Sequence, residues 1–567
     1  MKDKLKIEEY FDDKELIKIL IKKRVLAAKI GHDNHFFRNI SSKAKSPHLL
    51  KEMVIFSFFP PRCQWIRLKK EEREALRENT LEINSIQLER TVWREIKKCQ
   101  RLGLQYPLWL NKLLDKTEEI RKAVIDEGAY YNFAKSKIRP ELKKGNTYRP
   151  ISVFILKDSI IIGQIARYLS NCLDPLFSDS SYAFRTGIQK DKVFNHHKAV
   201  EDIIEFKNNV GKHLYVAECD IKKFFDCVNH KIIAEEFRSI TEEAKQKLNV
   251  EIDQRAVHFF HLYLNAYSFY EDVKMKEKEI LAANYISNGT IPWVSDSDLR
   301  EVNSDPLTER IGVPQGGAIS CLIANIMLNQ TDRVLNAKAD KNTFYCRFCD
   351  DMILMHTNKA KCKSLLKIYE KSLKKLKLIS HKPQDFAEYG KAFWDEKVKS
   401  KLPYKWAAIS HGSKAQSKKN VPWLSFVGYQ VRYDGVVRVR KKSIITELKK
   451  QVSVTDMVIK AVRKAIRPNR SRKAIKLRLQ QRLISMSVGR IRFGSTQSSM
   501  CWCAGFKVLK NNPFITNQIR RLDRNREKQI KRLERYLEKV KTPTRKSRVK
   551  PLKFFGHNYS YHKQFIK

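Results

Sequence analysis

The sequence lacks any long apolar run. The longest candidate, MVIFSFF from Met53, ends at Pro60-Pro61 and falls well short of the roughly 18 apolar residues that a membrane-spanning helix needs. The first residues, MKDKLKIEEYFDD, are charged from the start, which is unlike a secretory signal. We therefore expect a globular, cytoplasmic protein without membrane association, and its 567 residues are enough for several domains.

Cysteine is scarce as well. The 11 cysteines are too few and too scattered for a disulfide scaffold. Cys346 and Cys349 form a CxxC pair, and Cys501 and Cys503 form a CxC pair, but no second CxxC or HxxxH completes a zinc site. We expect reduced thiols that are part of the structure.

Acidic residues are the third shortage. The chain has 113 Lys and Arg against 62 Asp and Glu, a formal net charge of +51. A field of this sign attracts polyanions and speeds their encounter. We expect nucleic acid as the partner; an acidic membrane surface is the alternative, although no long amphipathic anchor accompanies the charge. Charge by itself says nothing about chemistry.

One acidic feature nevertheless stands out. In FYCRFCDDMILM (344–355), two apolar runs flank the adjacent acids Asp350 and Asp351, which predicts a β-hairpin with the acids at its tip. Two carboxylates this close repel each other unless a cation lies between them. A solvated acidic turn is the alternative. The pair Asp12-Asp13 differs, because it opens a helical stretch, where acids suit the helix N-terminus.

A further acid lies 130 positions upstream of the pair. In LYVAECDIKKFFDCVNH, residues 214–217 predict a strand with Asp220 at its end, and a helix is expected to start near Asn229-His230. A carboxylate at a strand end beside bulky aromatic residues can bind a metal. Asp220 and Asp226 as plain turn acids are the alternative.

The remaining segments supply weaker signals. Residues 1 to about 125 predict helices, and Arg149 and Lys157 flank the strand-like ISVFI. The glycines of GVPQGG allow a close backbone approach before a buried helix in AISCLIANIML. Asp434-Gly435 predicts a hairpin turn. The pattern of residues 519–540 predicts a helix that packs within the chain, and its apolar face consists of Ile519, Leu522, Leu533, Leu537 and Val540.

These stretches occur in a recognisable order. RPISVFILKD, FSDSSYAFRTG, CDIKKFFDCVNH, GVPQGGAIS, YCRFCDD, LKLISHKPQD and FVGYQVRYDGVVRVRKKS resemble the successive motifs of reverse transcriptases of the group II intron-like type, over roughly residues 135–445. The resemblance implies an α+β right-hand polymerase with fingers, an antiparallel-sheet palm and a helical thumb. The expected domains are a helical N-terminal extension (1–125), fingers (126–205), palm (206–442), thumb (443–510) and a basic C-terminal extension (511–567).

The resemblance also implies the catalytic residues. Asp220, Asp350 and Asp351 would be the catalytic carboxylates, and with the backbone carbonyl of Ile221 they would hold two Mg²⁺ ions about 3.5–4 Å apart. One ion would activate the primer 3′-hydroxyl, and the other would steady the triphosphate. Positioning and charge neutralisation would do most of the catalysis.

Five nucleotide-binding positions follow in the same way: Arg149, Lys157, Phe225, Gln315 and Lys382. Phe225 would lie beneath the sugar, where its ring collides with a 2′-hydroxyl, so we expect deoxyribonucleotides as substrates. Gln315 would lie against the templating pair. Arg149 and Lys157 match triphosphate-binding positions, and Lys382 matches a lysine near the leaving group. A further cation of the fingers, Arg185, is expected to brace them.

The chain departs from the family at the acid pair, where Phe348-Cys349 replaces the usual Tyr-Ala. This change is expected to alter the primer-end pocket and to leave the metal ligands in place. No HNH-type endonuclease or typical maturase segment follows the expected thumb. We therefore expect a free-standing enzyme of the abortive-infection or defence-associated reverse transcriptases, for which Tyr559 and Tyr561 are candidate priming residues or ordinary tail aromatics.

The leading hypothesis is thus an RNA-directed DNA polymerase in bacterial antiphage defence. Its expected partners are a structured noncoding or template RNA, the DNA product, deoxynucleoside triphosphates, and a second copy of the chain or a partner protein. The alternatives are an untemplated or protein-primed transferase that makes simple-sequence DNA, a mobile-element protein of the group II intron type, and an RNA-binding scaffold that has lost polymerisation.

Overall fold

The computed structural model describes residues 5–41, 54–75, 80–126, 128–186, 193–211, 213–303, 305, 308–386, 389–395, 397–408, 420–465, 471–487, 509 and 512–540. The chain forms two compact units. The first consists of Met1–Asp12 with Glu118–Val427, and the second of Asp13–Thr117 with Gly428–Lys567. The five domain boundaries expected from the sequence stay predictions.

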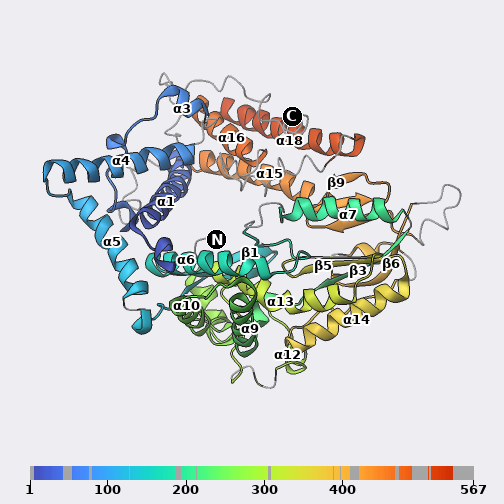
Figure 1. The fold of residues 1–567 in the computed structure, drawn as a ribbon. Coiled ribbons are helices and arrows are strands. Elements are labelled where there is room, and N and C mark those ends of the chain that lie inside the picture. The colour runs from blue at the N-terminus through green and yellow to red at the C-terminus, as the bar shows by residue number, and fades with distance from the viewer. Residues whose placement is uncertain are drawn as a thin grey trace. The chain divides into compact units, whose positions relative to one another are not determined.

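The first unit is a mixture of strands and helices (Figure 1). Its strands are β1 Lys137–Lys144, β2 Thr147–Val153, β3 Leu214–Asp220, β4 Thr343–Phe348, β5 Asp351–His356, β6 Lys401–Trp406 and β7 Trp423–Phe426. Its helices are α6 Leu156–Leu173, α7 His196–Val210, α8 Phe224–Cys227, α9 His230–Leu248, α10 Gln254–Asn265, α11 Glu277–Ala283, α12 Asp296–Arg300, α13 Ala318–Lys338 and α14 Lys359–Lys375. Shorter helical turns are Ile7–Tyr10, Gly128–Tyr130, Asp174–Leu176, Tyr270–Lys274 and Ala392–Trp394.

An antiparallel sheet of four strands, in the order β4-β5-β3-β6, is the centre of this unit. Every residue of β5 after Asp351 is buried, which explains the continuous apolar run MILMH in place of an alternating pattern. Helix α14 packs against β3, β5 and β6, and α13 packs against α14. The predicted hairpin β4–β5 and the predicted strand β3 are therefore confirmed, and they are neighbours in one sheet.

Two predicted helices begin where the sequence places them. Helix α9 starts after Asn229, whose side-chain Oδ1 accepts hydrogen bonds from the backbone N–H groups of Lys231 and Ile232. Such a cap satisfies donors that the first turn leaves unpaired. Helix α13 begins directly after Gly317 and is buried along most of its length. A β1–β2 hairpin, which the sequence did not predict as a pair, precedes α6.

The second unit is mainly helical. Its helices are α1 Asp13–Ser41, α3 Lys70–Ala75, α4 Thr80–Leu102, α15 Lys441–Arg463, α16 Arg472–Ser487 and α18 Pro513–Glu538, with short turns at Val54–Phe56 and Arg62–Gln64. Helix α5, Leu108–Ile125, runs from the second unit into the first. The strands β8 Tyr429–Arg432 and β9 Val437–Val439 pair across the predicted Asp434-Gly435 turn, where Gly435 has a φ of +87°.

The C-terminal helix α18 packs within the chain, as predicted from its apolar face. Leu533 and Leu537 share a buried cluster with residues of α15 and α16, such as Val458 and Leu479. Ile519 is also buried. Contacts join α18 to α15 and α16 in one helical bundle, and the expected boundary between the thumb and the C-terminal extension stays a prediction. The segment 488–508 of the expected thumb lies outside the described residues.

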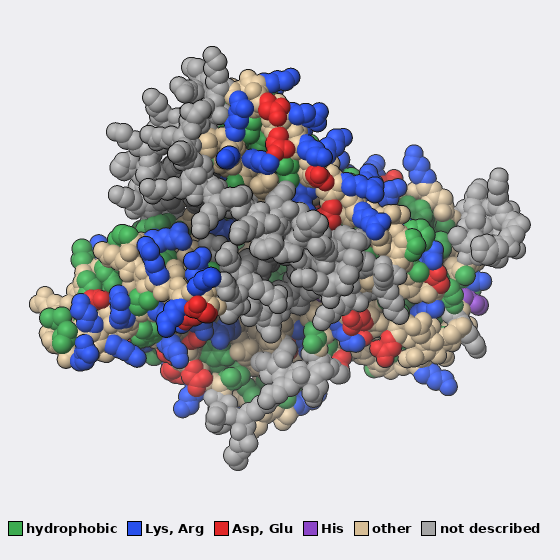
Figure 2. All heavy atoms as spheres, turned by 90° about the horizontal axis from the view of Figure 1, so that it is seen from above, with side chains coloured by type: hydrophobic (Ala, Val, Ile, Leu, Met, Phe, Trp, Pro, Cys, Tyr) green, Lys and Arg blue, Asp and Glu red, His purple; other side chains and the backbone are tan. Residues whose placement is uncertain are grey.

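Two bulk expectations can be compared with the described residues. None of their helices is both long and apolar enough to span a bilayer. All of their cysteines are free thiols; Cys501 and Cys503 lie outside the described range. On the face shown in Figure 2, Lys and Arg side chains are spread widely and Asp and Glu are fewer.

Candidate active site

The three candidate catalytic aspartates lie at one end of the central sheet. Asp220, the last residue of β3, is directly opposite Asp351, the first residue of β5. Across the hairpin, Phe348 of β4 is opposite the same Asp351, and Cys349 and Asp350 form the turn between them. The strand register therefore brings together acids that are 130 positions apart in the sequence.

The electrostatics of this cluster are those of crowded carboxylates. Burial raises the pKa of Asp350 above its ordinary value, and the charge of Asp220 raises it further. The pKa of Asp351 is raised in the same way, by desolvation and by the charges of Asp350 and Asp220, although Asp351 is exposed to solvent. A divalent cation would relieve this mutual repulsion.

Ile221, the predicted backbone ligand, follows Asp220 directly. The N–H of Lys222 donates to the carbonyl of Ile379 at 2.7 Å, and the N–H of His381 donates to the carbonyl of Asp220 at 2.9 Å. These two hydrogen bonds form a β-bridge between Ile221 and Ser380. They involve backbone groups of Asp220 and Lys222, the residues on either side of Ile221. The bridge thus fixes the backbone at Ile221 without consuming its carbonyl oxygen.

The chemistry of these donors suits a hard divalent cation, because carboxylate and carbonyl oxygens are the ligands that Mg²⁺ prefers. The side chains are not already gathered for this purpose. Among the described residues, no three His, Cys, Asp or Glu side chains form a group that could hold a metal. One oxygen of Asp220, Oδ2, instead faces the ammonium of Lys399 at 3.2 Å. The three aspartates fit a metal site by donor type and register, and the two-ion arrangement stays a prediction.

The loop that carries Gln315 is connected to the short helix α8, which contains Phe225. The Gln315 side chain donates from Nε2 to Oδ1 of Asp226 at 2.6 Å. Its carbonyl accepts from the N–H of Ser152 in β2 at 3.0 Å, and the N–H of Val313 donates to the carbonyl of Phe225 at 2.7 Å. The loop thus joins the β1–β2 hairpin to the segment that follows Asp220.

The predicted cations divide into two groups. Arg149 on β2 is exposed. Its positive charge lowers the pKa of Lys143 and of Lys223, and the negative charge of Asp220 raises the pKa of Lys143. Lys382 is exposed and directly follows His381, which bonds to Asp220. Lys157 contacts other residues: its ammonium pairs with Glu119 at 3.2 Å and lies over the Tyr131 ring. Neither of these two contacts involves the acid cluster.

Sequence reasoning missed three lysines near the acids. Lys399 pairs with Asp220, and Lys143 lies within electrostatic range of Lys399, Lys223 and Asp220. Burial lowers the pKa of both Lys143 and Lys223, and nearby cations lower it further. The only sequence signal is local richness in lysine, as in KVKSK before β6, and such richness occurs all along this chain.

Arg185, which we expect to brace the fingers, is held by several hydrogen bonds to nearby residues. Its Nε donates to Oδ1 of the buried Asp174 at 2.8 Å, and its Nη1 donates to the carbonyls of Ser178 and Ser181. Both charged side chains are almost fully buried. The candidate priming residues Tyr559 and Tyr561 lie outside the described residues.

Comparison with known proteins identifies the domain. Residues 142–387 match the family described as reverse transcriptase (RNA-dependent DNA polymerase). This region contains the β2 hairpin strand, the sheet strands β3 to β5 and all three aspartates. The chain therefore carries a reverse transcriptase domain, the catalytic domain of RNA-directed DNA polymerases, and has the right-hand polymerase fold that this domain implies.

Other similarities are more distant. Protein YkfC of Escherichia coli (strain K12) is 22% identical in an alignment of 245 residues that covers 38% of this chain, and the chain spans about half, 52%, of that relative's length. Two structures of apo telomerase from Candida tropicalis are also similar. One is 14% identical with a TM-score of 0.35, covering 91% of this chain and 81% of the other. The second, truncated from its C-terminal domain, is 16% identical with a TM-score of 0.34, covering 57% and 59%. Scores this low support no conclusion.

Proposed function

We propose that the chain is an RNA-templated DNA polymerase that transfers deoxynucleotides at the site of Asp220, Asp350 and Asp351. The observation that carries this proposal is the register of β3 against β5, inside a domain that matches reverse transcriptases. The register puts Asp220 beside the hairpin that carries Asp350 and Asp351, and the mutual repulsion of these carboxylates favours divalent cations such as Mg²⁺.

In this proposal the acids and the nearby cations have separate tasks. Bound divalent ions would lower the pKa of the primer 3′-hydroxyl and stabilise charge on the reacting phosphates. The carboxylates of Asp220, Asp350 and Asp351 and the carbonyl of Ile221 hold these ions. Arg149, Lys143 and Lys382 offer positive charge to the triphosphate, an electrostatic task that phosphoryl transfer always needs. Lys399 neutralises Asp220 when no metal is bound.

Substrate choice follows from the loop region beside the acids. Phe225 is half-buried and packs edge-to-face on Phe224, so its ring has a defined place from which to exclude a 2′-hydroxyl. Gln315 is held from two sides, by Asp226 and by the backbone of Ser152, as a residue that lies against the templating pair needs to be.

The experiment uses the purified chain with its co-purifying RNA, Mg²⁺ and labelled deoxynucleotides. We expect DNA complementary to the RNA, and at least about a hundredfold less DNA from the variant Asp350→Asn/Asp351→Asn. The other acid pair supplies a matched control, since Asp12→Asn/Asp13→Asn removes the same charge and is expected to retain synthesis. Wild-type yield from the Asp350/Asp351 variant would refute the site.

We also propose a biological setting, a defence-associated enzyme of the group II intron-like type that works with a dedicated structured RNA. The ordered motifs support this proposal, and the net charge of +51 suits a polyanionic partner. Cells that express the chain with its neighbouring RNA should resist phage in a plaque assay, and cells with the Asp350→Asn/Asp351→Asn variant should not. Resistance that survives this substitution would favour an RNA-binding scaffold.

Untemplated or protein-primed synthesis is the second candidate, and the turn before the acids favours it. Phe348-Cys349 stands where the family usually has Tyr-Ala, and Cys349 is buried in a left-handed conformation with a φ of +61°. This turn alters the expected primer-end pocket. Sequencing the product separates the two candidates, since a homopolymer or short repeat without a match in the bound RNA would support untemplated synthesis.

A further inference from the structure

A fully buried ion pair lies directly behind the acid turn and has no part in the proposed chemistry. Arg347 of β4 and Asp332 of α13 are both 0% exposed. The guanidinium donates from Nη2 to Oδ2 of Asp332 at 2.6 Å and from Nε to Oδ1 at 2.9 Å. The hydroxyl of Tyr345 also donates to Oδ1 of Asp332, at 2.6 Å. Asp332 thus fixes the guanidinium plane from one side.

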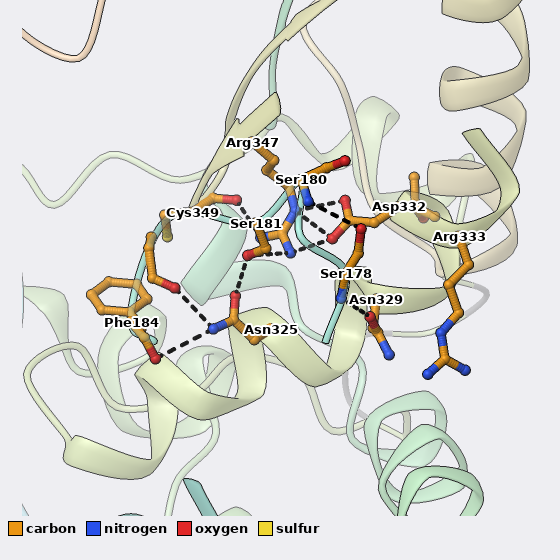
Figure 3. A network of polar contacts seen from close by, with 12 residues as sticks. Ser178, Ser180, Ser181, Phe184, Asn325, Asn329, Asp332, Arg333, Arg347 and Cys349 are labelled. Atoms are coloured by element: carbon orange, nitrogen blue, oxygen red, sulfur yellow. Dashed lines mark hydrogen bonds and ion pairs between the residues drawn. The ribbon is translucent and has the colours of Figure 1, made fainter. Parts of the chain in front are cut away.

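The other donors of Arg347 reach the acid turn. Its Nη1 donates to the carbonyl of Cys349 at 2.9 Å, and its Nη2 donates to Oγ of Ser181 at 3.0 Å. Figure 3 shows the side chain between Asp332, Ser181 and Cys349. The Cys349 carbonyl belongs to the peptide group that joins Cys349 to Asp350. A hydrogen bond to it fixes the plane of that peptide, and with it the direction in which Asp350 leaves the turn.

The turn needs such support. A φ of +61° at Cys349 is unfavourable for a residue with a side chain, and it persists only where the surroundings impose it. Arg347 is also held by its own backbone, because its N–H donates to the carbonyl of Ser180 and its carbonyl accepts from the N–H of Tyr182. Arg347 is therefore held in place by contacts other than its hydrogen bond to the turn.

A buried ion pair is a poor source of stability, since the desolvation of both charges offsets their attraction, and apolar replacements are often as stable. The guanidinium instead orients its neighbours, because its planar set of N–H donors binds several acceptors in a fixed geometry. Here those acceptors belong to α13, to the Ser178–Phe184 segment and to the acid turn. Ser181 continues the network by donating from Oγ to Oδ1 of Asn325.

We infer that Arg347, anchored by Asp332, is a positioning residue that holds the Cys349–Asp350 turn in the orientation that directs the two carboxylates toward Asp220. This inference rests on the proposed function, because it assigns the turn a catalytic purpose. Arg347 touches no substrate in this role. Its loss is expected to reduce turnover while leaving nucleotide binding by the surface cations nearly unchanged.

The test compares three variants. Arg347→Lys keeps the charge and loses the planar set of N–H donors. The triple variant Arg347→Met/Asp332→Leu/Tyr345→Phe replaces the whole polar group by apolar side chains, so that no charge is left buried alone. Tyr345→Phe alone is the matched control, because it removes one bond to Asp332 and leaves the Cys349 carbonyl bonded to Arg347.

We expect kcat to fall about a hundredfold in the triple variant and about tenfold in Arg347→Lys, with KM for deoxynucleotide within about threefold and little change in melting temperature. Tyr345→Phe should retain kcat within about twofold. A second readout needs no synthesis: Mn²⁺ binding followed by electron paramagnetic resonance should weaken about tenfold in the triple variant and stay unchanged in the control.

The outcomes separate the two claims. If the wild-type chain makes no DNA, the proposed function fails, and the Mn²⁺ measurement still tests the positioning of the turn. If the folded triple variant polymerises at the wild-type rate and binds Mn²⁺ equally well, the inference is overturned. Loss of kcat in proportion to a loss of melting temperature in all three variants would likewise overturn it, because that pattern marks a purely structural pair.

Discussion

Asp226 is a buried acid whose carboxylate holds the side chain of Gln315 in the neighbouring loop. Its carboxyl is 1% exposed, and its Oδ1 accepts from Gln315 while Oδ2 has no hydrogen-bond partner among the described residues. Burial raises its pKa to about 6, against smaller opposing effects of Lys223, Gln315 and Lys143. Asp226, for which a plain turn acid was the alternative, therefore anchors the Gln315 side chain at the cost of a poorly solvated charge.

A pH-dependent stability follows at this residue. The folded chain holds the Asp226 proton to a higher pH than the unfolded chain, so folding is favoured most below about pH 4 and loses this contribution as the pH rises through about 6. Asp226→Asn should flatten that part of the curve of melting temperature against pH. Equal slopes for wild type and variant between pH 4 and pH 6.5 would contradict the assignment.

Asp226→Ala serves as the companion variant, because it removes the acceptor of the Gln315 amide as well as the charge. We expect it to cost about 1 kcal/mol more than Asp226→Asn.

At the scale of elements, the loop before α13 is held by close contacts that only glycine permits. A Cβ on Gly317 would lie 1.8 Å from the hydroxyl of Tyr263, a fully buried side chain of α10 whose hydroxyl bonds to Ser320. Gly312, with a φ of +92°, lies against the backbone of Asp226 and the side chain of Phe269. The glycines therefore let the loop, α10 and the segment after Asp220 pack against one another.

We predict that Gly317→Ala destabilises the chain by about 2–3 kcal/mol, because neither Tyr263 nor the start of α13 has room to shift. Gly163→Ala is the matched control. Gly163 lies inside α6 with open space around its Cβ position, so alanine should stabilise the helix by about 0.5–1 kcal/mol. Thermal or urea unfolding measures both changes, and a destabilising Gly163→Ala would show that the contact argument is incomplete.

At the scale of the whole molecule, net charge bears on the nucleic-acid binding that we propose. With a net charge of +51, the chain would neutralise many phosphates of a bound nucleic acid and release their counterions. Both compact units contribute, since Lys and Arg occur throughout the sequence. Binding by this mechanism is strong at low salt and largely independent of sequence.

We therefore expect the affinity for structured RNA to fall about a thousandfold or more between 50 and 200 mM salt, measured by fluorescence anisotropy. The Asp350→Asn/Asp351→Asn variant is the control, because it changes no Lys or Arg that could pair with phosphate; its salt dependence should match that of the wild type. A nearly salt-independent affinity would show that contacts other than phosphate charge dominate.

The sequence alone determined the local elements and the identity of the candidate acids. The apolar runs around Asp350 predicted the β4–β5 hairpin, and the ordered motifs predicted the polymerase domain. The start signal at Asn229 predicted α9, a continuous apolar stretch predicted α13, and an apolar face predicted α18. Each of these signals depends on residues that are near one another in the chain, where turn chemistry and side-chain spacing act directly.

Only the tertiary structure decided which side chains support the acids. The pairing of Lys399 with Asp220, the bond from Gln315 to Asp226 and the buried pair of Arg347 with Asp332 join residues that are between 15 and 179 positions apart. No local pattern distinguishes Lys399 or Asp332 from the other charged residues of so basic a chain. Their roles arise because strand register and helix packing bring particular side chains together, and these depend on the whole fold.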